Sequence, residues 1–333
     1  MSTRRTAQII FLCTMLSLAL AASGQVTALT PYTVSVFATS VPGVYFQPDS
    51  IAVLNGHIFV GYGNNVSTTG SDGKSSTIVE YDRNGNILKI YSVQGHNDGL
   101  KVDPRTNKLW ALQNEDGNPN LVIIDPVSGT QTAPYTFGPT PHGGGYDDMA
   151  FSGNDVFISA SNPANNPNDH PAIVRAEISG NMVNVTPVLM GTATVTDIPT
   201  DTPIALNLQD PDSMKFDPFG DLVLDSQADG ELIIVHHPGG FDQTAYHLAL
   251  TLDGASVQID DTIYATSTHG AILVSDRDGE TVYSISKDIF SPSAAYSAAL
   301  TSVGKLDLDT GVITNVVTGM VSPHGMAFIR ENE

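Results

Sequence analysis

The sequence predicts an all-β fold, a single β-propeller built from four-stranded antiparallel blades. After residue 28 no stretch shows a sustained helical period, and short runs rich in Val, Ile, Tyr, Phe and Thr alternate with Gly-containing turns. One hexapeptide pattern recurs along the chain, and each clear copy is followed by further short strands. Six blades are the preferred count, with five or seven left open.

The repeated hexapeptide carries an acidic or imidazole side chain at its second position, here called the anchor, and continues as a strand. Clear copies cover 48–53, 97–102, 146–151, 211–216 and 323–328, and a weaker copy covers 252–257. The first three anchors are 49 residues apart, within the roughly 40 to 50 residues of a propeller blade. A β-sandwich is the alternative. It has no need for five equivalent opening strands, whereas each propeller blade presents one to the central channel.

The clear copies continue as meanders. In the first copy a second strand follows at 57–60, a third at 77–82 and a fourth at 87–93. The last copy ends at Ile329, which leaves no room for a full blade after it. We therefore expect the strand at 32–37 to join the last sheet and close the ring.

Residues 1–28 are expected to be a cleaved signal peptide, and 29–333 the propeller domain. Arg4 and Arg5 precede an apolar run, and cuts after Ala21 or Ala28 both suit a signal peptidase. The run is short for a membrane span. The only cysteine, Cys13, leaves with this segment, so the mature chain has no disulfide. We expect a secreted or periplasmic protein.

The composition excludes several kinds of partner. The 333 residues include 35 acidic and 14 basic side chains, which gives a net charge of −21. Such a surface repels nucleic-acid phosphates and anionic lipid, so neither a nucleic acid nor a membrane is expected to bind. With 41% hydrophobic and 15% charged residues the chain is not disordered. We expect a monomer with a small-molecule or glycan ligand in the central channel.

The anchors are the candidate metal ligands. Because each one precedes an innermost strand, all of them are expected at one mouth of the channel. The predicted ligands are Asp49, Asp98, Asp147, Asp212 and His324, with Asp253 from the weaker copy. Carboxylates with an imidazole suit Ca²⁺ first, and Mg²⁺, Mn²⁺ or Zn²⁺ as alternatives. His96 and His142, expected just outside this ring, are the candidates for moving protons. Alternatively, each Asp bonds backbone amides of the next blade and needs no ligand.

Two segments resemble a known repeat. Residues 212–226 and 98–111 are similar to the repeats of the NHL and gluconolactonase-like propellers, the calcium-dependent phosphotriesterase-like superfamily. The resemblance implies a propeller and, in the lactonases and paraoxonase-like esterases, a divalent cation held by Glu, Asn and Asp in the channel. The superfamily also contains strictosidine-synthase-like proteins, virginiamycin-lyase-like proteins and non-catalytic binders. This sequence has Asp212 and His324 where Asn is usual, and Asp49 nearest the place of the glutamate.

The expected function is metal-dependent hydrolysis of a lactone or similar ester. A non-catalytic propeller that binds a glycan, cell-wall or protein partner is the alternative, and a histidine-based lyase is the second. The sequence has no Gly-x-Ser-x-Gly elbow, no His-Glu-x-x-His and no phosphate-binding glycine loop. A serine hydrolase, a zincin-type protease and a nucleotide enzyme are therefore not supported.

Overall fold

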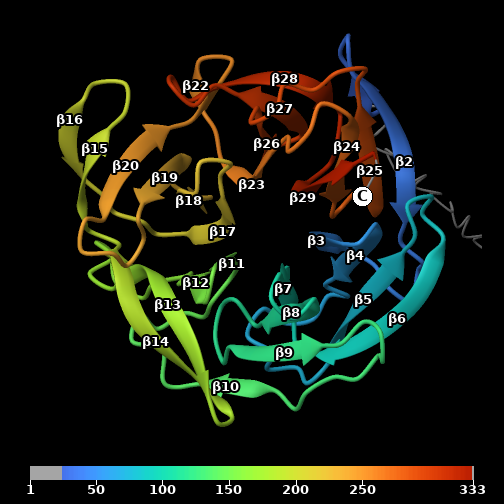
Figure 1. The fold of residues 1–333 in the computed structure, drawn as a ribbon, viewed down its shortest axis with the longest axis horizontal. Coiled ribbons are helices and arrows are strands. Elements are labelled where there is room, and N and C mark those ends of the chain that lie inside the picture. The colour runs from blue at the N-terminus through green and yellow to red at the C-terminus, as the bar shows by residue number, and fades with distance from the viewer. Residues whose placement is uncertain (1–24, 332–333) are drawn as a thin grey trace, which may run out of the picture.

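The computed structural model describes residues 25–331, which form a ring of twisted sheets around a central axis (Figure 1). Every regular element among these residues is a β-strand, so the all-β prediction is confirmed. None of the described residues forms a helix long and apolar enough to cross a membrane. Most of the predicted signal peptide, residues 1–24, lies outside the described residues.

The strands form five hydrogen-bonded sheets. The first contains β3 (Pro48–Leu54), β4 (His57–Tyr62), β5 (Ser75–Tyr81) and β6 (Ile87–Gln94). The second has eight strands, in two meanders: β7 (Asn97–Asp103), β8 (Lys108–Gln113), β9 (Asn120–Ile124) and β10 (Tyr135–Phe137), then β11 (Met149–Ser152), β12 (Asp155–Ser159), β13 (Pro171–Ser179) and β14 (Met182–Met190). A short parallel pairing of β10 with β14 joins the two meanders.

The other three sheets complete the ring. One contains β17 (Pro211–Phe216), β18 (Leu222–Ser226), β19 (Glu231–His236) and β20 (Thr244–Ala249), with β15 (Thr194–Asp197) and β16 (Thr202–Ala205) outside them. The next contains β23 (Ile259–Tyr264), β26 (Ala295–Ala299), β27 (Ser302–Leu306) and β28 (Val312–Thr318), with β1 (Thr27–Ala28), β21 (Thr251–Leu252) and β22 (Ala255–Ser256) on its outer side. The last contains β29 (Pro323–Arg330), β24 (Gly270–Asp276), β25 (Thr281–Ser286) and β2 (Thr33–Thr39).

Six strands line the channel, namely β3, β7, β11, β17, β23 and β29 (Figure 1). Each contacts the next, and β29 contacts β3 to complete the circle. The ring is closed by the N-terminal strand β2, which pairs with β25 in the register Val34↔Ile285 and so lies in the same sheet as the C-terminal strand. The predicted closure of the ring is therefore confirmed.

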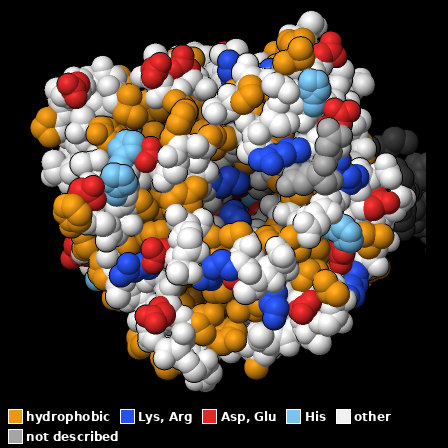
Figure 2. Space-filling view, viewed as in Figure 1, with side chains coloured by type: hydrophobic (Ala, Val, Ile, Leu, Met, Phe, Trp, Pro, Cys, Tyr) orange, Lys and Arg blue, Asp and Glu red, His pale blue; other side chains and the backbone are white. Residues whose placement is uncertain are grey.

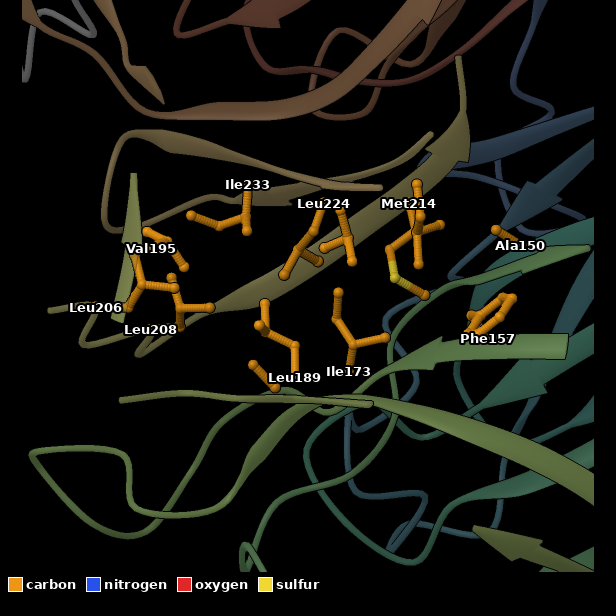
Figure 3. Close-up of a cluster of buried hydrophobic side chains, with 13 residues drawn as sticks. Ala150, Phe157, Ile173, Leu189, Val195, Leu206, Leu208, Met214, Leu224 and Ile233 are labelled. Atoms are coloured by element: carbon orange, nitrogen blue, oxygen red, sulfur yellow. The ribbon is translucent and has the colours of Figure 1, made fainter. Parts of the chain in front are cut away.

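Apolar side chains between neighbouring sheets form the core. Between β13 and the sheet of β17 to β20, the fully buried Ile173, Leu224 and Ile233 pack together (Figure 3). Each such side chain stabilises the fold by about 1.5–3 kcal/mol. The described residues contain no cysteine, so these contacts and the paired termini, rather than disulfides, hold the sheets together.

The position of β1 bears on where the predicted signal peptide would be cut. Thr27 and Ala28 pair with Thr318 and Val317 of β28, and the Leu29 amide donates to the Val316 carbonyl at 2.8 Å. A cut after Ala28 would remove this strand, so if the predicted signal peptide is cleaved, we expect the cut after Ala21. Intact-mass measurement of the exported protein checks this, and a mature chain that begins at Leu29 would contradict it.

Candidate functional site

The anchors lie in β-bulges at the start of five of the six inner strands, and Asp147 lies just before the sixth, β11. In β7, Asn97 pairs with Gln113 and Leu100 with Ala111, which leaves Asp98 and Gly99 outside the regular pairing. The same irregularity occurs at the start of β3, β17, β23 and β29. Because a bulge re-aims a side chain out of the pleat, this local geometry turns the anchors toward the channel.

Small residues after the anchors let neighbouring blades approach closely. A Cβ atom at Gly99 would collide with the backbone oxygen of Asp147, and one at Gly325 would lie 2.8 Å from the Asp49 oxygen. Only glycine permits such an approach of two backbones. The contact brings the anchors of successive inner strands together at the mouth.

These side chains line one pocket of about 190 Å³. It contains all five predicted ligands, together with His96: Asp49, Asp98, Asp147, Asp212 and His324. Ten acidic side chains line it in all, but Lys101 and Arg277 are its only lysine or arginine. The predicted convergence of the anchors is therefore observed.

Two groups of ligand-type atoms meet at Asp98. Asp49, His96 and Asp98 each offer one atom within 4.8 Å of the others, and so do Asp98, Asp147 and Asp212. Atoms that coordinate one cation at 2.0–2.6 Å lie no more than about 5 Å apart. Both groups therefore have the spacing of a cation site.

The residue after the anchor, rather than the anchor itself, accepts the hydrogen bond from a backbone amide of the next blade. Asp148 accepts the Met214 amide at 2.9 Å and pairs with Lys101 Nζ at 2.6 Å. Asp261 accepts the Met326 amide at 2.7 Å and pairs with Lys215 Nζ at 2.6 Å. These two acids bond one inner strand to the next blade. The alternative interpretation of the sequence assigned this backbone-capping role to the anchors themselves.

The anchor carboxylates, by contrast, do not cap backbone amides. Among the described residues, no backbone amide of another residue donates to Asp49, Asp98, Asp147 or Asp212. Their side-chain contacts are a 3.5 Å one from Ser213 Oγ to Asp212, the 3.9 Å ion pair of Asp49 with Arg277, and the one between the carboxyl groups of Asp147 and Asp98. Asp147 is only 7% exposed, and its buried Oδ1 atom has no hydrogen-bond partner. A buried carboxylate oxygen left unpaired is costly. The anchors are therefore arranged for a ligand rather than for the fold.

Crowding perturbs the ionisation of these acids. Burial and the nearby charge of Asp98 raise the pKa of Asp49, and burial followed by Asp212 and Asp98 raises the pKa of Asp147 well above its usual range. Burial raises the pKa of Asp260 to about 8, and burial together with Asp98 raises the pKa of Glu115 to about 10. Without a cation, several of these carboxyls retain protons at neutral pH.

Two histidines face the acids. His96 Nδ1 lies 3.0 Å from the Val66 carbonyl, so Nδ1 carries the proton and Nε2, 3.6 Å from Glu115 Oε1, offers its lone pair to the pocket. His324 Nδ1 lies 3.0 Å from the Ser322 carbonyl. Burial opposes the charge of His324, but Asp260 and Asp49 outweigh it and raise its pKa to about 9. His324 is thus a cation at neutral pH.

Two sequence-predicted residues lie elsewhere. The structure does not bring His142 into the pocket: its Nε2 lies 2.6 Å from the Gly145 carbonyl and its ring packs on Tyr146. Asp253 is an exposed residue in the turn between β21 and β22, at the outer side of its sheet. Its assignment as an anchor was wrong, because the Asp-Gly pair at 253 and 254 makes a hairpin turn.

Sequence reasoning missed several residues of the pocket, among them Asp260, Glu115, Arg277 and Asp210. The sixth anchor is Asp260, at the start of β23, and the strand 259–264 was the signal for it. Arg277 belongs to the hairpin turn between β24 and β25, and its Nε lies 3.9 Å from Asp49 Oδ2. Glu115 and Asp210 come from loops for which the repeat gives no signal.

A second pocket, of about 370 Å³, lies further along the same inner strands. Its walls are apolar, with Phe151, Phe216 and Phe328 among them, and the ion-paired Lys101 and Lys215 also line it. Figure 2, seen along the channel, shows Lys or Arg side chains in the central hollow with hydrophobic side chains around it. Lys101 lines both pockets, so the channel has one acidic and one apolar compartment.

The neighbours Asp147 and Asp148 provide a test of the two roles assigned to these acids, ligand binding at the anchor and backbone capping at the residue after it. Asp148→Asn is expected to lower the free energy of unfolding by about 2 kcal/mol, because the hydrogen bonds donated by Lys101 and Met214 lose their charge and Lys101 loses its ion-pair partner. Asp147→Asn is expected to raise that of the metal-free protein by roughly 1 kcal/mol, because it removes a repelled, unpaired carboxylate. Urea unfolding of both variants measures this, and equal losses would contradict it.

No protein-family model matches the sequence, and no curated protein matches it. Solved structures similar to the chain include a streptogramin B lyase (12% identity, TM-score 0.47, 88% of this chain and 73% of that one) and the virginiamycin B lyase from Staphylococcus aureus (9%, 0.48, 88% of each). A periplasmic gluconolactonase from Pseudomonas aeruginosa is another (11%, 0.49, 90% and 99%). Gluconolactonase-like propellers, which the repeats resemble, are thus among the similar structures, and at these identities we assign no activity from them.

Proposed function

We propose that the acidic pocket binds a divalent cation and hydrolyses a lactone or similar ester, in an exported protein. The observation that carries the proposal is the release of the anchors from backbone capping, which leaves Asp98, Asp147 and Asp212 converging with an unpaired oxygen on Asp147. We also count the two meanders of the eight-stranded sheet as separate blades. The propeller then has six blades, each of which supplies one anchor.

The donor set fits a hard cation. Asp98, Asp147 and Asp212 supply oxygen atoms, which Ca²⁺, Mg²⁺ and Mn²⁺ prefer, and their mutual repulsion is relieved by positive charge. Once bound, such an ion supplies Lewis-acid polarisation of an ester carbonyl and lowers the pKa of bound water. Ca²⁺ is our first choice because the ligands are mostly carboxylates.

The other residues of the pocket would move protons and hold charge. The His96–Glu115 pair, 3.6 Å apart, can accept a proton from the attacking water, because His96 Nε2 carries a free lone pair. His324, cationic and 3.6 Å from Asp260, can donate a proton to the alkoxide that leaves when the ester bond breaks. Arg277 can hold a substrate carboxylate or hydroxyl at the rim.

The test combines metal analysis with a panel of lactones and aryl esters. Wild-type protein is expected to carry a divalent cation and to hydrolyse one class of substrate, a lactone to its hydroxy acid or an aryl ester to its acid and phenol, with activity lost on chelation and restored by the ion. His142→Gln, outside the pocket, should retain activity. Bound cation without turnover on any substrate would favour the non-catalytic binding protein, and an unsaturated product would assign a lyase.

A further inference from the structure

We infer that the pocket holds two divalent cations, bridged by the carboxylate of Asp98. The inference rests on the proposed function, which needs only one ion, and concerns how many ions these residues bind. Its basis is the pair of ligand groups that share Asp98 and no other residue. A carboxylate has two oxygen atoms, and two-metal sites place their ions about 3.5–4 Å apart.

The group of Asp98, Asp147 and Asp212 contains a buried carboxylate oxygen with no hydrogen-bond partner. Asp147 is 93% buried, and its Oδ1 has no hydrogen-bond partner among the described residues. Asp212 is 9% exposed, and its carboxylate accepts only the 3.5 Å contact from Ser213. Buried carboxylates without donors are stabilised when a cation supplies the missing charge.

The group of Asp49, His96 and Asp98 has its own, independent indication. His96 is 1% exposed, and its ring is oriented by the Val66 carbonyl at Nδ1. A backbone carbonyl at one ring nitrogen is how proteins orient a histidine that binds a metal through the other. Its Nε2 makes no hydrogen bond to any described residue, and the nearest carboxylate oxygen, on Glu115, is 3.6 Å away.

The charge of the pocket also favours two ions over one. Of its ten acids, Asp148 and Asp261 are paired with lysines. The other eight face only Arg277 and the imidazolium of His324 as cations. With these two cations, one divalent ion offsets about four of the eight carboxylates and leaves half of the negative charge unbalanced, whereas two ions offset about six.

Two bound ions would reassign His96. Its Nε2 becomes a ligand and cannot accept a proton. The positive charge of the ions would release the proton that Glu115 otherwise retains, so Glu115 alone would serve as the base beside it. His96 and Glu115 would then share a proton only when the ion of the Asp49, His96 and Asp98 group is absent.

The experiment counts Mn²⁺ ions. Chelator-treated full-length mature protein is equilibrated with Mn²⁺, freed of excess ion, and analysed by plasma mass spectrometry and electron paramagnetic resonance. We expect two ions per chain in wild type and one each in His96→Gln and Asp147→Asn. We expect a magnetically coupled spectrum in wild type that reverts to an isolated six-line signal in both variants. Asp253→Asn, an identical substitution type in an exposed turn, is the control and should keep two coupled ions.

The outcomes separate the two proposals. One ion per chain in wild type, unchanged by His96→Gln, would overturn the pair and leave the single-ion hydrolase standing. Two ions without magnetic coupling would overturn the Asp98 bridge. No bound ion would overturn both proposals. Melting temperatures of the variants, compared in the metal-free state, exclude misfolding as the cause of a lost ion.

Discussion

Replacing Asp98 with Asn is expected to abolish cation binding and to lower kcat/KM for the lactone substrate by about 1,000-fold or more, which corresponds to roughly 4 kcal/mol of transition-state stabilisation. Asp98 is the one residue common to both ligand groups. The amide is isosteric but neutral, so the pocket keeps its shape and loses the charge that attracts the ion. Steady-state kinetics at saturating cation measure the loss.

The same substitution should make the metal-free protein more stable, because it removes a charge that raises the pKa of Asp49, Asp147 and Glu115. Loss of activity with a gain in stability is the signature of a residue kept for function. Asp253→Asn, in a turn with φ 52° that Asn tolerates, should change neither quantity. A less stable Asp98→Asn protein would instead indicate a structural role.

The metal-free protein is expected to lose stability as the pH rises from about 5 to 8, and saturating cation should offset the loss. The pKa of Asp260 is raised to about 8 and that of Asp147 is raised well above its usual range. Between pH 4 and 8 the folded state therefore holds protons that the unfolded state has released, so the free energy of unfolding falls with rising pH. His324, with a pKa of about 9, acts in the same direction above pH 6.5.

Cation at 100 times its dissociation constant should add about 2.7 kcal/mol at pH 8. Thermal unfolding from pH 5 to 8, with and without the ion, measures both effects. Asp98→Asn protein should show a shallower pH dependence and no response to the ion. A metal-free wild type that becomes more stable toward pH 8 would contradict the proposed electrostatics.

The repeat pattern was sufficient to predict the architecture. Because every inner strand opens with the same motif, the positions of Asp49, Asp98, Asp147, Asp212 and His324 at one mouth followed from the fold. The merging of two meanders into one sheet did not follow, because it depends on two residue pairs between β10 and β14. No sequence signal marks such a short parallel contact.

The errors in the site have local physical causes. At Asp253 the following glycine suggested an anchor, but the pair forms a turn, while Asp260 lacks a preceding Pro or aromatic cue. His142 follows an extended loop whose path depends on a hydrogen bond to Gly145, which no periodicity reveals. The division of work between Asp147 and Asp148 depends on a bulge-like break before β11 and could be seen only in three dimensions.

Calorimetric titration of chelator-treated protein with Ca²⁺ at pH 7.5 tests the central claim most directly. Because several carboxyls of the pocket retain protons without a cation, we predict saturable binding whose heat varies with the ionisation enthalpy of the buffer, as protons are released. Asp98→Asn should show no saturable heat. The absence of saturable binding to wild type with Ca²⁺, and likewise with Mg²⁺, Mn²⁺ and Zn²⁺, would contradict the account.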